Sequence, residues 1–236
     1  MDSGNDMVKV ENLKKQFGNI TAIDIDRLSI PKGQKFGLVG NNGAGKTTLF
    51  RLVLDLIKPT HGEILVNGNP VVLKDEWKAF TGSFLDESFL IGFLSPEEYF
   101  DFIAQLQSVE KVELDTFLDR FNMFFNDEVL GKKKYIRDMS RGNQRKIGIV
   151  GSMIGSPKLL VLDEPFANLD PSSQRQLSLI LREEQQFHDT TMLISSHDLT
   201  HVTEVSDRIV VLEKSKIVKD LSVGQNALAD LEMYFS

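Results

Sequence analysis

Residues 40–48 constrain the fold of this chain more than any other stretch. They read Gly40, Asn41, Asn42, Gly43, Ala44, Gly45, Lys46, Thr47 and Thr48, which fits the pattern G-x-x-x-x-G-K-[ST]. The pattern needs a strand before it and a helix after it, and the apolar residues 35–39 and the helical pattern of residues 48–54 supply both. We therefore predict a phosphate-binding loop at a strand-to-helix turn rather than an ordinary glycine-rich surface turn.

The residue types of this loop suit nucleotide phosphates. Glycine lets the backbone adopt positive φ and lets N–H groups approach an anion without a Cβ in the way. These N–H groups converge at the positive end of the following helix. Lys46 is long enough to reach the outer phosphates, and the hydroxyl of Thr47 is placed to bind Mg²⁺. The stretch is thus expected to hold a nucleotide together with magnesium.

The composition excludes several other classes of protein. The 236 residues include no cysteine, so disulfides, zinc ribbons and thiol catalysis are ruled out. A net charge of −7 argues against nucleic acid as a ligand, because phosphate backbones select basic surfaces. The first six residues are polar and acidic, unlike a secretion signal, and no apolar run approaches the ~18 residues that span a bilayer. If the protein works at a membrane, we expect another chain to supply the spans.

The N-terminal part has the pattern of antiparallel strands. Residues 8–13 and 20–30 are predicted as strands, the second with a one-residue slip between Ile25 and Leu28 that a bulge would allow. These two strands precede the strand that leads into the phosphate loop.

A helix and a hairpin are expected after the phosphate loop. The helix should run from Lys46 to near residue 58, because the residue before Pro59 is biased out of the α region. The dipeptide Asn67-Gly68 between apolar runs then predicts a hairpin of residues 63–66 and 70–73.

The character of the chain changes to helical over about residues 88–139. Ser95, Pro96 and Glu98 have the order of a helix start, with an N-cap, proline at the first position and glutamate at the third. Apolar residues then recur at helical spacing, which favours a helical core over an aromatic cofactor site. These residues are Phe100, Ile103, Leu106, Leu114, Phe117, Leu118, Phe121, Phe124 and Phe125. The run Lys132, Lys133 and Lys134 is interpreted as a solvated loop.

Alternating strands and helices return after residue 139. Residues 159–162, 192–195 and 208–212 are expected to be buried parallel strands, followed by a short strand at 217–218 and a C-terminal helix within residues 220–236. The predicted fold class is α/β, with a P-loop NTPase core on a mostly parallel sheet, an N-terminal antiparallel β subdomain and a helical insertion. All of residues 1–236 are assigned to this one domain.

A second acidic motif follows the buried strand at residues 159–162. Asp163 and Glu164 would lie at the carboxyl edge of a parallel sheet, where open α/β sheets bind ligands. One carboxylate can coordinate Mg²⁺ while the other polarises water. An acidic loop that caps the helix after Pro165 is the alternative, and the phosphate loop in the same chain favours the functional interpretation.

Five motifs in order resemble those of the ATP-binding-cassette (ABC) ATPases, which power membrane transporters. They are the phosphate loop, Met139-Ser140-Arg141-Gly142-Asn143-Gln144, Leu162-Asp163-Glu164-Pro165, Ala167-Asn168-Leu169-Asp170 and Ser195-Ser196-His197. The resemblance extends over about residues 8–220. It implies ATP and Mg²⁺ as the bound groups.

The resemblance also implies roles for individual residues. Asp163 would help hold Mg²⁺, Glu164 would be the general base for the attacking water, and His197 would bond the γ-phosphate. Ser140, Gly142 and Asn143 would meet the γ-phosphate held by a second subunit, and Asp170 would lie at the interface of the two subunits. Phe17 has the position of the aromatic that stacks on adenine, with a core phenylalanine as the equal alternative.

Two departures from the family pattern affect these roles. The signature peptide is usually Leu-Ser-Gly-Gly-Gln and here keeps only the serine and one glycine, while Arg141 adds a charge near the opposing nucleotide. The glutamine that usually reports the nucleotide state to the membrane partner is replaced by Asp86, for which we expect a role toward Mg²⁺. A glutamate at this position resembles bacterial exporters, and Asp86 is a shorter version of it, which favours export over import. An exposed loop aspartate is the alternative.

The sequence therefore predicts an ATP-hydrolysing subunit that powers a separate transmembrane permease. It would act as a homodimer with two ATP molecules between its copies, or as a heterodimer with a second ATPase subunit, at the inner face of the cell membrane and without nucleic acid. A soluble ABC ATPase of assembly, translation or repair is the alternative. A scaffold without turnover is disfavoured by the intact Lys46, Asp163, Glu164 and His197. The transported substrate is left open, because the membrane partner selects it.

Overall fold

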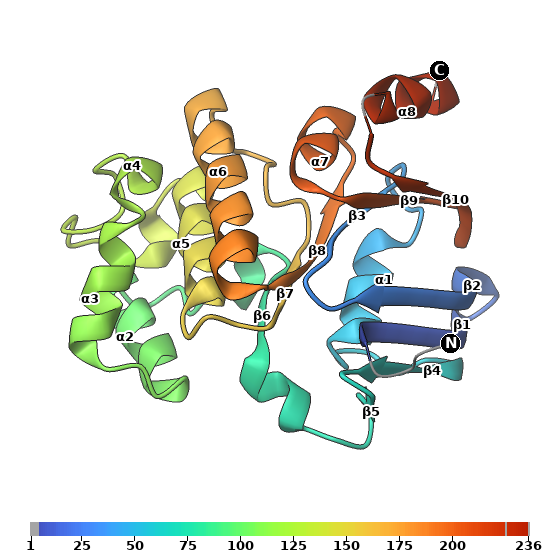
Figure 1. The fold of residues 1–236 in the computed structure, drawn as a ribbon. Helices are drawn as coiled ribbons and strands as arrows, with labels where there is room; N and C mark the ends of the chain where they lie inside the picture. Colours follow the sequence, from blue (N-terminus) through green and yellow to red (C-terminus); the bar gives the residue numbers. More distant parts are fainter. Residues whose placement is uncertain (1–4, 225, 236) are drawn as a thin grey trace.

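The computed structural model describes residues 5–224 and 226–235, which form two sheets and their covering helices (Figure 1). The four-stranded sheet has the order β2-β1-β4-β5, and the six-stranded sheet has the order β10-β9-β3-β8-β7-β6. The strands are β1 (Asp6–Phe17), β2 (Ile20–Pro31), β3 (Lys35–Val39), β4 (His61–Val66), β5 (Asn69–Pro70), β6 (Thr81–Phe84), β7 (Leu159–Leu162), β8 (Thr191–Ser196), β9 (Arg208–Glu213) and β10 (Lys216–Ser222).

The helices lie on both faces of the six-stranded sheet and at one end of the molecule. The α-helices are α1 (Lys46–Val53), α2 (Pro96–Leu106), α3 (Lys111–Asp119), α4 (Asn122–Phe125), α5 (Arg141–Met153), α6 (Pro171–His188), α7 (Leu199–Val205) and α8 (Ala227–Phe235). The 3₁₀ helices are η1 (Glu76–Phe80), η2 (Glu87–Phe89) and η3 (Ile136–Asp138). None of the helices in the described part of the chain is long and apolar enough to cross a membrane.

The six-stranded sheet is parallel except at one edge, as predicted. β3 pairs in parallel with β8 and β9, and β7 pairs in parallel with β6 and β8, while β10 runs antiparallel to β9. All four residues of β7 are buried, because Leu160 and Leu162 pack into the core on the α5 side while Leu159 and Val161 pack into the core on the α1 side. A strand covered on both faces has to be apolar throughout, which explains its uninterrupted hydrophobic run.

The helix that follows the phosphate loop lies between the two sheets. The side chain of Phe50 in α1 is completely buried in the core that the four-stranded sheet shares with one face of the six-stranded sheet. This packing fixes the axis of α1, and therefore the direction in which its N-terminal N–H groups point.

The predicted slip in the second strand is present, but it does not shift the register of β2 against β1. Ile25 and Leu28 are both buried with two exposed residues between them, yet Leu13 stays opposite Ile25 and Val10 stays opposite Leu28. β1 has the matching irregularity at Asn12, whose φ is 48°. Both strands therefore bend at the same point and keep their inward side chains aligned.

The helix prediction for residues 46–58 was wrong at its end, because α1 stops at Val53. Asp55 has φ 52° and donates its N–H to the carbonyl of Leu52 at 3.1 Å, while Leu56 donates to the carbonyl of Arg51 at 2.9 Å. This pair of bonds is a Schellman C-cap, which closes a helix whenever the residue after it adopts the left-handed region.

The predicted hairpin forms, but its second strand is shorter than expected. Asn67 and Gly68 both have positive φ, 49° and 78°, as a type I′ turn requires. β5 comprises only two residues, since Leu73 donates its N–H to the carbonyl of Pro70 at 3.2 Å and turns the chain away. Val71 is buried, whereas Val72 and Leu73 are exposed.

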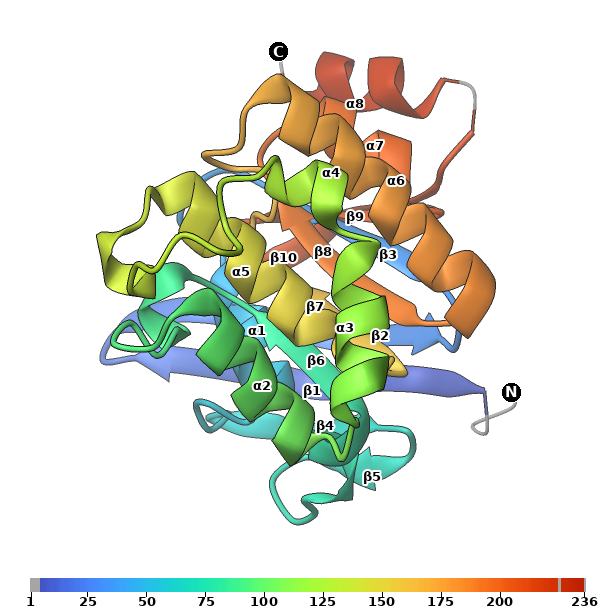
Figure 2. The ribbon, with the colours of Figure 1, turned by 90° about the vertical axis from the view of Figure 1, so that its left-hand side faces the viewer.

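The helices α2, α3 and α4 form a separate layer beside α5 (Figure 2). Ser95 and Glu98 make the predicted capping box, with the Ser95 hydroxyl accepting from the Glu98 N–H at 3.2 Å and a Glu98 carboxylate oxygen accepting from the Ser95 N–H at 2.8 Å. The aromatic stripe is confirmed as core, because Phe100, Phe121, Phe124 and Phe125 are at most 2% exposed. Leu106 was wrongly included and is 65% exposed.

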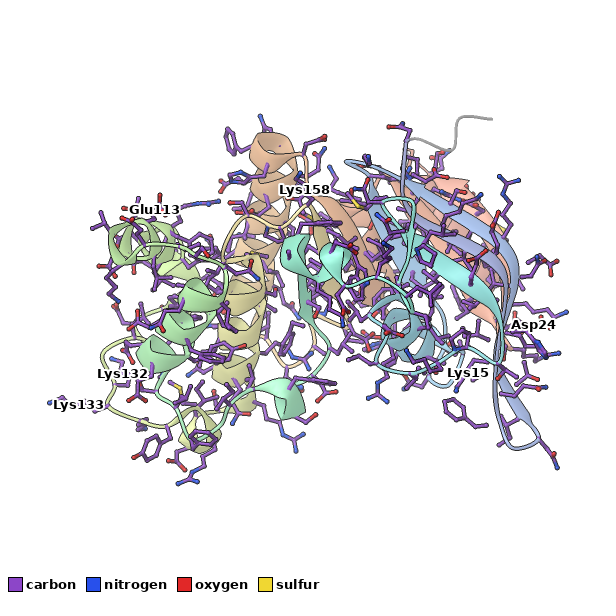
Figure 3. All side chains as sticks on the ribbon, turned by 90° about the horizontal axis from the view of Figure 1, so that it is seen from below. Lys15, Asp24, Glu113, Lys132, Lys133 and Lys158 are labelled. Atoms are coloured by element: carbon purple, nitrogen blue, oxygen red, sulfur yellow. The ribbon has the colours of Figure 1, made fainter. Side chains whose placement is uncertain are left out.

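Three further predictions concern the lysine run and the C-terminal part of the chain. Figure 3 shows Lys132 and Lys133 projecting from their loop away from the rest of the molecule, and Lys134 is exposed too, in agreement with a solvated loop. The last strand is longer than the predicted residues 217–218, since β10 extends from Lys216 to Ser222. The predicted C-terminal helix is α8, and Ser236 lies outside the described residues.

Candidate functional site

The phosphate loop lies between β3 and α1 and borders a cavity of about 210 Å³. Gly45 has φ 115°, and a Cβ on it would lie 2.5 Å from the carbonyl oxygen of Ala22. A Cβ on Gly40 would lie 2.3 Å from the carbonyl oxygen of Leu212. Glycine is therefore required at both positions by the close approach of the neighbouring backbone. The cavity is lined by Ala22, Asn41, Asn42, Gly43, Ala44, Gly45, Lys46, Thr47, Thr48 and Glu164.

Lys46 is buried at the base of this loop with two partners. Its Nζ donates to the carbonyl oxygen of Gly40 at 2.7 Å and lies 3.2 Å from Oε1 of Glu164. The residue is only 6% exposed. A buried ammonium needs such partners, and a phosphate that enters the cavity would compete with Glu164 for it.

Asp163 is buried directly behind Thr47. The Thr47 hydroxyl donates to Oδ2 of Asp163 at 2.5 Å, and the Ser195 hydroxyl donates to Oδ1. Burial raises the pKa of the Asp163 carboxyl above its ordinary value, while the hydrogen bonds from Ser195 and Thr47 act in the opposite direction. A divalent cation would stabilise the ionised form.

The donor set at this point fits magnesium. Mg²⁺ prefers hard oxygen ligands and is usually bound by one or two protein groups together with substrate phosphates and water. The Thr47 hydroxyl and the Asp163 carboxylate are such ligands beside a phosphate cavity. Within residues 5–224 and 226–235, no group of three or more His, Cys, Asp or Glu side chains could hold a metal by itself.

Glu164 lies between the lysine and a histidine. Its Oε2 is 2.7 Å from Nδ1 of His197 and also accepts the backbone N–H of His197 at 3.2 Å, while Oε1 faces Lys46. Its backbone has φ 50°, in the left-handed region that residues other than glycine seldom adopt. Glu164 and His197 are thus brought together as predicted, at the edge of the phosphate cavity.

The signature residues begin α5, away from this cavity. The Ser140 hydroxyl caps α5 by accepting the N–H of Asn143 at 3.2 Å. A Cβ on Gly142 would lie 3.0 Å from the carbonyl oxygen of Asn168, so the start of α5 packs against the loop before α6. None of these signature residues lines the phosphate cavity of its own chain.

Asp170 caps the next helix, α6. Its carboxylate accepts the N–H groups of Ser172 and Ser173 at 3.0 Å and both of their hydroxyls at 2.6 Å. These bonds, led by the Ser172 hydroxyl, hold the pKa of the Asp170 carboxyl well below its ordinary range.

The structure places Asp86 and Phe17 outside the immediate contacts of the phosphate loop. Asp86 caps η2 by accepting the N–H of Ser88 at 2.8 Å, and its Oδ2 lies 3.9 Å from Nη2 of Arg51. Phe17 is 51% exposed at the end of β1, which excludes the alternative of a core phenylalanine. The Lys15 ammonium lies over the Phe17 ring, 4.8 Å from the ring centroid.

Sequence reasoning gave no role to two residues at the site, of which Ser195 appeared only as part of a motif and Arg145 not at all. Ser195 bonds both Asp163 and the N–H of Glu164, the latter at 2.9 Å. Arg145 donates to the carbonyl oxygen of Glu164 at 2.6 Å and to the carboxylate of Glu87 at 2.8 Å. One signal in the sequence could have pointed to Arg145. It is a charged residue close to the apolar residues 147–150 of the same predicted helix, where a charge needs a partner.

These contacts define the chemistry of the site. Glu164 is next to a cation and an imidazole at the carboxyl edge of a parallel sheet, within reach of an anion held by the loop. A carboxylate placed there can accept a proton from water that attacks a terminal phosphate. Fold and site together define a P-loop ATPase.

Comparison with known proteins gives the particular family. The family model described as ABC transporter matches residues 23–167. The chain belongs to this family. It is accordingly an ATP-binding and ATP-hydrolysing subunit of the kind that powers transport through a separate membrane partner.

Individual relatives and structures agree with this assignment. The chain is 35% identical to the uncharacterized ABC transporter ATP-binding protein YhaQ of Bacillus subtilis, over 90% of this chain and 70% of the relative. It is 32% identical to the lantibiotic transport ATP-binding protein SrtF of Streptococcus pyogenes, over 90% of this chain and 89% of that protein.

Solved structures show the same fold. An ATP-binding subunit of an ABC transporter superposes with a TM-score of 0.82 at 23% identity, over 97% of this chain and 93% of that one. The ATP-binding cassette MJ0796, in a dimeric post-hydrolysis state bound to ADP and Pi, superposes with a TM-score of 0.81 at 20% identity, over 92% of this chain and 99% of that one.

Proposed function

We propose that two copies of this chain, or one copy and a second ATPase subunit, close around two ATP molecules. Each ATP would be held by residues 40–48 of one subunit and by Ser140, Gly142 and Asn143 of the other, with Asp170 at the interface. The observation that carries the proposal is the convergence of Lys46 and Glu164 on one cavity, while the signature residues lie outside it. Phe17 would stack on the adenine from its exposed position.

In this proposal the residues of the site divide the work of hydrolysis. The β- and γ-phosphates of ATP would replace Glu164 as the partner of the Lys46 ammonium. The Glu164 carboxylate would then be free to accept a proton from water. His197 would hold the carboxylate through Nδ1 and bond the γ-phosphate. Thr47 and Asp163 would hold Mg²⁺, which neutralises phosphate charge when bound. Asp86 would act on the same ion through water.

The partner in the proposal is a transmembrane permease that selects the substrate. The chain would work at the inner face of the cell membrane, as one ATPase domain over residues 1–236 with a helical subdomain at about 88–139. Asp86 in the place of the usual glutamine supports export. The net charge of −7 supports the absence of nucleic acid from the complex.

The experiment that tests this function is purification of the tagged chain from membranes, followed by mass spectrometry and an ATPase assay. We expect a membrane-spanning protein to co-purify and the complex to hydrolyse ATP. Recovery only with partners that lack membrane spans would instead support a soluble ABC ATPase of assembly or repair.

A further inference from the structure

Arg145 is a buried arginine that connects two loops at the ATPase site. It is 6% exposed and belongs to α5. Its Nε donates to Oε1 of Glu87 at 2.8 Å, and its Nη2 lies 2.8 Å from the same oxygen. Its Nη1 donates to the backbone carbonyl oxygen of Glu164 at 2.6 Å. The planar guanidinium has donors in a fixed fork, so one side chain can hold both groups at once.

The sheet explains why these two loops are neighbours. β6 and β7 run in parallel with Phe84 opposite Leu162, and the N–H of Asp163 donates to the carbonyl of Phe84 at 3.0 Å. The loops that follow the two strands therefore leave the same edge of the sheet side by side. The guanidinium carbon of Arg145 lies 5.8 Å from the centroid of the Phe84 ring, which fixes the side chain over the end of β6.

The backbone of Glu164 needs to be held because it is left-handed. With φ at 50°, this glutamate has a conformation that an L residue rarely adopts without support. Its N–H donates to the Ser195 hydroxyl at 2.9 Å, and its carbonyl accepts from Arg145. The two bonds hold the peptide groups on both sides of the residue, and they direct its carboxylate to Lys46 and His197.

We infer that Arg145 is a positioning residue that holds Glu164 in its reactive orientation and couples that orientation to the loop that carries Asp86 and Glu87. This rests on the proposed role of Glu164 as the general base. Asp86 precedes Glu87 in that loop and bonds Ser88, so a displacement of the loop pulls on the Glu87 carboxylate. Arg145 transmits this pull to the backbone of Glu164.

The test compares Arg145→Met, which keeps the stem and removes the donors, with the wild-type protein in steady-state ATPase assays. Displacement of a reacting group by about 1 Å costs about a hundredfold in rate, so we expect kcat to fall about tenfold to a hundredfold. The KM for ATP and the MgATP affinity from calorimetry should stay unchanged, because residues 40–48 hold the nucleotide. A role in folding alone would lower the melting temperature without this split between kcat and KM.

Arg145→Lys keeps the positive charge but loses the planar guanidinium that bonds Glu87 and Glu164 at the same time. It provides the test if the methionine variant does not fold. We expect a folded protein whose kcat lies between those of wild type and Arg145→Met. Glu87→Gln should lower kcat less than Arg145→Met, and combining the two should give no further loss, because both changes break one linkage.

Arg120→Met is the matched control. Arg120 also bonds a buried carboxylate, Glu184, at 2.7 Å, but it does so in the helical layer away from the phosphate cavity. Its loss should lower the melting temperature and leave kcat unchanged. Wild-type kcat in a folded Arg145→Met, or in Arg145→Lys if only that variant folds, would overturn the inference.

Glu164→Gln in the same assay separates the two proposals. Loss of turnover in Glu164→Gln together with wild-type kcat in Arg145→Met would overturn only the role of Arg145. Retained turnover in Glu164→Gln would overturn the assignment of the general base itself.

Discussion

Lys46 is paired with groups of its own chain. Its ammonium lies 3.2 Å from Glu164 and donates to the carbonyl of Gly40, so both the lysine and the carboxylate are held in place. A phosphate that displaces Glu164 from this lysine would activate the base at the moment of binding. In the proposed function, exchange of this ion pair for contacts between Lys46 and the phosphates would couple ATP binding to release of the Glu164 carboxylate.

The first prediction is that Lys46→Ala abolishes MgATP binding while the fold persists. Hydrogen bonds to charged groups contribute about 1.5–3 kcal/mol each, so losing the contacts to two phosphates should weaken binding by at least about a hundredfold. Calorimetry measures the affinity, and circular dichroism checks the fold. Lys35→Ala is the control, because Lys35 pairs with Asp207 at 3.2 Å outside the cavity and should leave the affinity unchanged. Unchanged affinity in Lys46→Ala would refute the assignment of the loop.

The second prediction is that Asp86→Asn lowers the Mg²⁺ dependence of ATP binding. Asparagine keeps the oxygen that caps η2 by accepting from Ser88, but it removes the charge that would repel a γ-phosphate without metal. For a partly exposed charge we expect Mg²⁺-free ATP to bind about two- to fivefold more tightly. Titration of Mg²⁺ at fixed ATP tests this, with Asp115→Asn in α3 as the control. Superimposable curves would show that Asp86 does not sense the metal.

Sequence patterns predict the parts of the site that are local in the chain. Residues 40–48 form one turn, and Asp163 and Glu164 follow one strand, so their spacing was sufficient to predict that they lie together at one edge of the sheet. Arg145 is different, because its partners lie 19 and 58 positions away and meet it only when α5 packs on β6. No local pattern encodes that contact.

The same distinction holds for whole elements. The buried strand β7 was predictable because a strand buried on both faces is an uninterrupted apolar run. The capping box of α2 was predictable because it needs particular residue types at fixed spacing. The end of α1 was not, since it depends on the left-handed conformation of Asp55, which asparagine and aspartate tolerate but do not require. Pro59 sets only the last position at which the helix could end, and α1 ends earlier, at Val53.

The third prediction concerns the cap of α6 and its dependence on pH. Hydrogen bonds from Ser172 and Ser173 depress the pKa of Asp170 in the folded protein, so the ionised carboxylate stabilises the native state. This contribution is fully present above the unfolded pKa of about 3.9 and is lost as the pH falls through the lower folded value. Wild type should therefore exceed Asp170→Asn in unfolding free energy by about 1 kcal/mol at neutral pH, from the charge at a helix N-terminus.

Urea unfolding of both proteins from pH 7 down to pH 2 measures this difference. The advantage of wild type should be constant above pH 5 and should shrink below about pH 4. Ser172→Ala removes one hydroxyl donor and so raises the folded pKa of Asp170, which should make the decline end at a higher pH and reduce its total size. A difference that stays constant down to the lowest pH would mean that folding does not change the pKa of the Asp170 carboxyl.

At the scale of the whole molecule, the proposed site takes residues from two subunits. The phosphate loop, Thr47, Asp163 and Glu164 meet at one edge of the sheet, whereas the start of α5 packs against the loop before α6 and does not line the cavity. Figure 1 shows the helical layer and the four-stranded sheet on opposite sides of the six-stranded sheet. A second subunit in the reverse orientation would bring its signature residues to the open side of the nucleotide.

The last prediction follows from this proposed arrangement. Glu164→Gln keeps the size of the side chain but cannot accept a proton, and it also removes the charge that pairs with Lys46. ATP should then bind without being hydrolysed, and kcat should fall by at least about a hundredfold. We expect the variant to form a dimer of twice the monomer mass in MgATP and to remain monomeric in MgADP, as measured by size exclusion with light scattering. Adding Lys46→Ala should abolish the dimer, because nucleotide no longer binds. A Glu164→Gln variant that stays monomeric and turns over ATP at the wild-type rate would show that another residue is the base and that no ATP-bound dimer forms.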